Sequence, residues 1–166
     1  RPRPRLDMRL FTALLPLSLL ALGACGGADA TEADVFKLVQ EGKFDAAIEA
    51  AETQLASVTK GTAEHKELVI QYASALAKDQ PDSARDRFLE FAKANEAAVE
   101  PRDFRYVDGQ LRRHDHLVVS IDVMDAGMKR WPEDPVMKEV VDALKQQIAS
   151  SGNAAAAAKM KGLGYM

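Results

Sequence analysis

Apolar residues recur at intervals of three and four from Val35 to about Ser150, which is the spacing of helices that bury one face. The clearest stripe follows Gly42 and consists of Phe44, Ala47, Ile48, Ala51, Leu55 and Val58. No segment alternates polar and β-branched positions as a half-buried strand does. The pattern therefore predicts an all-α domain over residues 35–150.

Glycine, proline and capping residues divide this pattern into three helical hairpins. Gly42 separates the helices of the first pair, Thr62 is a candidate cap for the second, and Pro81 and Pro101 each begin a new helix. The later stripes are Val69, Tyr72, Ala73 and Leu76; Ala84, Phe88, Phe91 and Ala92; Phe104, Val107 and Leu111; and Leu117, Ile121, Met124 and Met128. Trp131-Pro132 ends the third hairpin.

The last stripe runs from Val136 to Ile148 and begins after the cap and proline at Asp134-Pro135. It has no partner, so we expect a C-terminal helix that caps the stack. Residues 151–166 are predicted to be a flexible tail, in which residues 154–158 form either a helical stub or a spacer.

The segment from Arg9 to Gly27 places an apolar run of about a dozen residues behind a basic flank, which is typical of a secretory signal and too short to span a membrane. Its end, Leu22-Gly23-Ala24-Cys25, resembles the lipobox of bacterial lipoproteins. The resemblance implies cleavage before Cys25, a lipid such as palmitate on Cys25, and the loss of residues 1–24. An ordinary signal peptide and a short uncleaved anchor are the alternatives.

Cys25 is the one cysteine of the chain, so an intramolecular disulfide cannot form after export. Met8 begins an ordinary signal, and we expect translation to start there. Residues 25–34 are small and acidic, a composition that suits a flexible tether. In lipoproteins of diderm bacteria, Gly26 in place of an aspartate implies the outer membrane, facing the periplasm.

Ala47, Ala84 and Ser120 occupy equivalent points of the three hairpins, about 36 residues apart. The segment from Glu41 to Ala50 is similar to the turn and second helix of a tetratricopeptide repeat, with Gly42 closing the first helix and Phe44 packing after it. The resemblance implies a right-handed stack of hairpins (an α-solenoid) whose first helices line a concave groove for peptides.

The later repeats depart from that family pattern. The turn at Pro81 is one residue short, Ser120 replaces the usual alanine, and Asp108 replaces a small residue. The repeats are therefore degenerate, and their boundaries are open.

The charge of the mature chain argues against nucleic-acid binding. The full sequence has 22 basic and 25 acidic side chains, and residues 1–24 hold four arginines and one aspartate. The mature chain therefore keeps 18 basic and 24 acidic side chains, a net charge of −6. A general nucleic-acid binder needs a basic surface instead.

Motifs for catalysis are missing from the sequence. We find no nucleophile motif and no phosphate-binding glycine loop, and predict neither a catalytic residue nor a cofactor. His114-Asp115-His116 is the densest group of metal-ligating residues, but no third and fourth ligands stand at supporting spacing. We expect a solvated turn there, no metal site and no enzyme; a zinc enzyme is the alternative.

Four arginines share one side of the helix that begins at Pro101. Arg102, Arg105, Arg112 and Arg113 fall within an arc of about 100° that also contains Gly109, opposite Phe104, Val107 and Leu111. We call Arg102, Arg105, Gly109, Arg112 and Arg113 the arginine arc. Guanidinium groups around a position without a side chain can bind a carboxylate or phosphate. The alternative is a solvated helix face whose arginines pair with nearby acidic side chains.

Two functions follow from these patterns. The first is a lipid-anchored adaptor of the bacterial envelope that binds another envelope protein through an acidic peptide segment. The alternative is a lipoprotein that binds a small anionic ligand or a cell-wall fragment.

Overall fold

The computed structural model describes residues 33–166. The predicted signal peptide, the lipobox with Cys25 and most of the tether lie outside the described residues. The described chain is helical throughout and contains no strand, which confirms the all-α prediction. Its helices are α1 (Val35–Gln40), α2 (Phe44–Leu55), α3 (Ala63–Leu76), α4 (Pro81–Ala94), the 3₁₀ turn η1 (Glu96–Ala98), α5 (Pro101–Arg113), α6 (Leu117–Arg130), α7 (Pro135–Ser151) and α8 (Ala154–Gly162).

Local capping chemistry sets several of these boundaries. Gly42 takes the left-handed φ of 73° after α1. Thr62 Oγ1 accepts from the His65 backbone N–H at 3.1 Å, and Asp134 caps α7 in the same way. Glu100 and Asp103 form a capping box at the start of α5, where Pro101 is the first residue.

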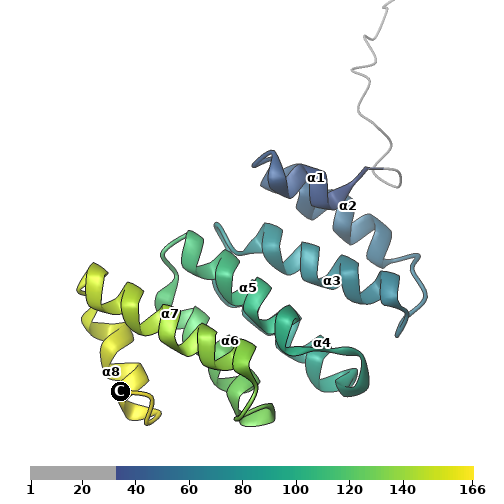
Figure 1. Cartoon of the computed structure of the whole chain (residues 1–166). Helices are drawn as coiled ribbons and strands as arrows, with labels where there is room; N and C mark the ends of the chain where they lie inside the picture. The colour runs from purple at the N-terminus through teal and green to yellow at the C-terminus, as the bar shows by residue number, and fades with distance from the viewer. Residues whose placement is uncertain (1–32) are drawn as a thin grey trace, which may run out of the picture.

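The helices follow one another across the molecule, as Figure 1 shows. Each helix packs against the next, and the odd-numbered helices α1, α3, α5 and α7 also contact one another in chain order. The even-numbered helices α4, α6 and α8 do the same. The result is two rows of helices, with the hydrophobic core between them.

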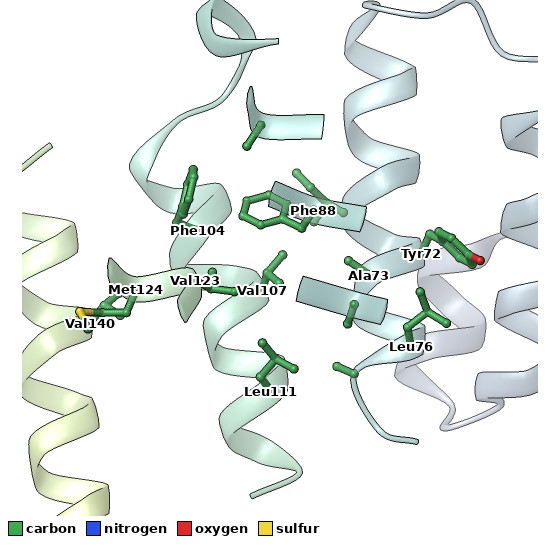
Figure 2. Close-up of a cluster of buried hydrophobic side chains, with 14 of the residues drawn as sticks. Tyr72, Ala73, Leu76, Phe88, Phe104, Val107, Leu111, Val123, Met124 and Val140 are labelled. Carbon is green, nitrogen blue, oxygen red and sulfur yellow. The ribbon is translucent and has the colours of Figure 1, made fainter. Parts of the chain in front are cut away.

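The predicted apolar stripes form that core. Figure 2 shows buried side chains that α3 to α7 contribute to it. The rings of Phe88 and Phe104 meet edge to face with centroids 4.8 Å apart, and Phe104 makes a similar contact with Trp131 at 5.5 Å. These contacts join α4, α5 and the end of α6 in one apolar cluster.

A buried polar cluster contains Asp108 and Ser120, two residues at which the sequence departs from the predicted repeat pattern. Asp108 is fully buried, accepts a hydrogen bond from Ser120 Oγ, and accepts another from Arg112 Nε at 2.7 Å. Burial raises the pKa of the Asp108 carboxyl; Arg112 and Ser120 lower it only in part, so it stays above its ordinary value. The aspartate and the serine thus occur together because each is the hydrogen-bond partner of the other inside the α5–α6 contact.

The prediction of a flexible C-terminal tail is wrong, and of the two alternatives for residues 154–158 the structure has the helix. Residues 154–162 form helix α8, which packs against α6 and α7, so α7 has a partner and is no lone cap. Ala156 and Met160 are fully buried. Tyr165 Oη donates to Asp125 Oδ1 at 3.0 Å, which ties residues beyond the helix to α6.

The contact at Ala47 gives a direct test of the first hairpin. Ala47 is fully buried in α2, which packs against α1 and α3. We expect Ala47→Leu to lower the free energy of unfolding by about 1–3 kcal/mol, because the added atoms find no space. Urea denaturation measures this change, and an unchanged midpoint would contradict the packing described.

Candidate functional site

A hollow of about 500 Å³ opens on the row of odd-numbered helices. It is lined by residues of α1, α3 and α5, among them Arg102, Arg105, Gly109 and Arg113. We call this the arginine hollow. Four members of the arginine arc thus meet at one concave surface.

The three arginines of the hollow are held weakly. Arg102 pairs with Glu100 at 2.6 Å and Arg105 with Glu139 at 3.4 Å, but both arginine side chains are more than half exposed. Such surface pairs contribute little and are screened by salt. Arg113 is exposed and has no ion pair within residues 33–166. These guanidinium groups can therefore exchange their partners for a ligand.

Gly109 leaves space between these arginines. A Cβ atom built at this position would meet nothing within 4 Å, whereas one at Gly127 would collide with Met137. The fold therefore does not require glycine at 109 for packing. Its effect is to leave the floor of the arginine hollow without a side chain.

Arg112 differs from the rest of the arginine arc. It does not line the hollow; its side chain is only 21% exposed and pairs with the buried Asp108. Its backbone oxygen also accepts from Gln147 Nε2 of α7 at 3.1 Å. The structure gives Arg112 a role in joining α5 to α7, so the prediction that it contacts a partner is not carried further.

Three polar residues of the hollow escaped the sequence analysis. Gln71, Tyr106 and Gln110 line it, and both glutamines are more than nine-tenths buried. Gln71 lies within Leu68–Leu76, where every residue is buried. The available signal was one amide inside a mostly apolar helical segment, and a search for clusters of charged residues does not find it.

Two carboxylates, Asp103 and Glu67, line the hollow beside its three arginines, so the lining keeps a net charge of +1. Asp103 pairs with Lys66 at 3.3 Å and accepts from the Glu100 backbone N–H at 2.9 Å. Glu67 accepts a hydrogen bond from Gln71 Nε2 at 3.2 Å. Against three arginines, Glu67 is therefore the one lining carboxylate without a basic side chain bonded to it among the residues described.

The beginning of the described chain lies beside this site. Ala33 and Asp34 line a smaller hollow together with Phe36, Glu67 and Gln71, and these last three residues also line the arginine hollow. Phe36 is 47% exposed, so an apolar ring stands at the edge that the two hollows share.

The histidine pair lies in the turn between α5 and α6. His116 Nε2 donates to the Lys78 carbonyl oxygen at 2.8 Å, and the ring of His114 meets Phe44 edge to face. Burial, followed by the charges of His116 and Arg113, lowers the pKa of His114. Within residues 33–166 no three His, Cys, Asp or Glu side chains come together in a way that could hold a metal ion.

A second hollow, of about 670 Å³, lies among α2, α3 and α4. Tyr72 Oη donates to Glu52 Oε1 at 2.7 Å there, and burial together with this bond raises the pKa of Tyr72 to about 12. Its rim carries Lys60 and Arg87 as well as Glu52 and Glu90. Charges of both signs give this hollow no preference for an anion.

Comparison with known proteins finds no family model, no curated protein and no solved structure that matches this chain. In the described part of the chain, every helix is too short or too polar to cross a membrane.

Proposed function

We propose that this protein is a lipid-anchored adaptor of the bacterial envelope, in which tetratricopeptide-like helical repeats bind an acidic segment of another envelope protein. The arginine hollow is the observation that carries the proposal. Its role is to bind and not to catalyse, because its residues offer charge and hydrogen bonds but no nucleophile with an adjacent base.

Two features support the repeat interpretation. The odd-numbered helices contact one another in order, as the first helices of stacked hairpins do. In addition, the equivalent residues Ala47, Ala84 and Ser120 are all fully buried. On this interpretation α7 and α8 form a fourth hairpin, and the arginine hollow belongs to the row that lines the groove in the family.

The arginines themselves provide the test. Changing Arg105→Gln and Arg113→Gln together should weaken capture of an acidic partner segment and flatten its salt dependence, because two charges that attract it are removed. The free energy of unfolding should move by no more than about 0.5 kcal/mol, since both side chains are exposed. Partner capture from cross-linked cells and peptide titration at two salt concentrations measure these effects.

A matched control is the pair Arg87→Gln and Lys93→Gln on α4, which removes the same charge from exposed positions outside the arginine hollow. This pair should leave binding unchanged. Equal losses in both pairs would indicate attraction by net charge alone and would contradict a specific groove.

A small anionic ligand or cell-wall fragment is the second candidate, and the volume of the hollow favours it. About 500 Å³ falls within the range of small-molecule sites. Such a ligand would be removed by dialysis and would raise the unfolding midpoint when added back. A peptide partner captured in cells, with no dialysable ligand, would exclude it.

Lipid attachment at Cys25 is proposed from the lipobox, with the outer membrane as the location. Radiolabelled palmitate should enter the wild-type protein and not Cys25→Ser, because that cysteine supplies the thiol. Mass spectrometry of the mature protein should find no peptide from residues 1–24. Labelling that persists in Cys25→Ser would rule the anchor out.

A further inference from the structure

Two buried oxygen atoms of the arginine hollow have no hydrogen-bond partner. They are Gln71 Oε1 and Tyr106 Oη, and within residues 33–166 they are the buried side-chain polar atoms left in this state. Both residues line the same hollow, one from α3 and the other from α5. Buried polar groups are almost always paired in folded proteins, so two exceptions at one site call for a partner from outside the chain.

The amide of Gln71 is fixed in orientation. Its Nε2 donates to Glu67 Oε1 at 3.2 Å, and a carboxylate accepts only from the nitrogen end of an amide. Gln71 Oε1 therefore presents an acceptor that lacks a donor. The side chain is 95% buried and lines the hollow, so bulk water does not satisfy this acceptor.

We propose that the arginine hollow binds the main chain of an extended acidic peptide, with Gln71 Oε1 accepting a peptide N–H and Tyr106 Oη donating to a peptide carbonyl. The proposal rests on the proposed function and adds the groups that recognise the backbone. Arg102, Arg105 and Arg113 hold the carboxylates of the same segment.

A peptide backbone matches this set of groups because each residue supplies one N–H donor and one carbonyl acceptor close together. The lining of the hollow also includes the exposed Phe36 and the buried Ile70, which suit an apolar residue between acidic ones. A simple inorganic anion would meet the arginines but would leave the buried Gln71 acceptor without a donor. The pairing of acceptor, hydroxyl and arginines therefore favours a peptide over an isolated anion.

The experiment uses a fluorescein-labelled octapeptide of alternating glutamate and leucine, titrated at low salt into the full chain. Gln71→Met removes the amide oxygen and nitrogen, Tyr106→Phe removes the hydroxyl, and both keep the approximate shape of the side chain. Each should weaken binding about three- to tenfold, which is the effect of one hydrogen bond. The unfolding midpoint of Tyr106→Phe without peptide should stay the same or rise, because the hydroxyl removed has no partner in the free protein. Gln71→Met also loses the hydrogen bond from Nε2 to Glu67, so its binding affinity and not its midpoint tests the inference.

Gln147→Met is the matched control. Both ends of the Gln147 amide are hydrogen-bonded to Arg112, so this change should lower the unfolding midpoint and leave peptide binding intact. An octapeptide with methylated backbone nitrogens should bind the wild type more weakly than the unmethylated octapeptide does. The methylated octapeptide should bind Gln71→Met and the wild type with equal affinity.

The outcomes separate the two proposals. If Gln71→Met and Tyr106→Phe bind the octapeptide normally while Arg105→Gln with Arg113→Gln weakens it, the backbone contacts are wrong and the adaptor function stands. If the midpoint of Tyr106→Phe falls as in Gln147→Met, the Tyr106 hydroxyl has a partner within the folded protein and the inference is overturned. A wild-type protein that ignores the octapeptide at low salt overturns the proposed function itself.

Discussion

Asp108→Ala is expected to lower the free energy of unfolding by about 3 kcal/mol. The substitution removes the acceptor for Ser120 and for Arg112 and leaves a small void at a fully buried position. The loss stays at the lower end of the range for a broken buried pair, because the Arg112 side chain is 21% exposed and regains water. Urea unfolding with a fixed m-value measures the change.

A double-mutant cycle tests the origin of that loss. Ser120→Ala should cost about 1–2 kcal/mol, and Asp108→Ala with Ser120→Ala should cost less than the sum of the two single changes. Asp108→Asn keeps the shape and an acceptor, so it should be milder than alanine. Strict additivity would show that the aspartate and serine act independently, against the geometry described.

A chain that ends at Gly152 is expected to lose well over 2 kcal/mol of stability. Truncating the fully buried Met160 side chain alone should cost about 2–5 kcal/mol, and removing all of α8 also uncovers apolar surface on α6 and α7. A flexible tail could be removed without any such effect. Urea unfolding of the shortened chain and of Met160→Ala measures both losses.

The exposed residues at the same end of the chain provide the control. Leu163 is 39% exposed and Met166 57%, so alanine at either position should change stability by less than about 0.5 kcal/mol. Full stability in the chain that ends at Gly152 would show that α8 does not hold α6 and α7 together.

The helices could be predicted from the sequence because their signals are local. The apolar stripes, the Thr62 cap and Pro101 each act within a few residues, and the structure has the corresponding helices in the same order. A helical stub and a spacer both stayed open for residues 154–158 because these residues are all alanine, which leaves almost no contrast between the two faces of a helix. Met160 is the one large apolar residue on the buried side, and a single residue cannot show the periodicity of a helix.

The candidate site could be predicted only where one helix carries it. Helical angles placed Arg102, Arg105, Gly109 and Arg113 on one side of α5, and all four line the hollow. The same angles do not predict that Arg112 lies toward α7, because its position depends on the buried Asp108 and on Gln147, which is 35 residues away. Nor can they join Gln71 to Tyr106, which come together only because α3 packs against α5.

If Cys25 is lipid-anchored, the position of Ala33 and Asp34 beside the arginine hollow limits how far that hollow can stand from the bilayer. If Cys25 carries the lipid, the eight residues from there to Ala33 cover at most roughly 28 Å when fully extended. The hollow would then be confined to a thin layer next to the membrane surface and would not reach the rest of the periplasm. Partners confined to the same surface would meet it at a raised local concentration, so a modest affinity for each acidic segment would suffice.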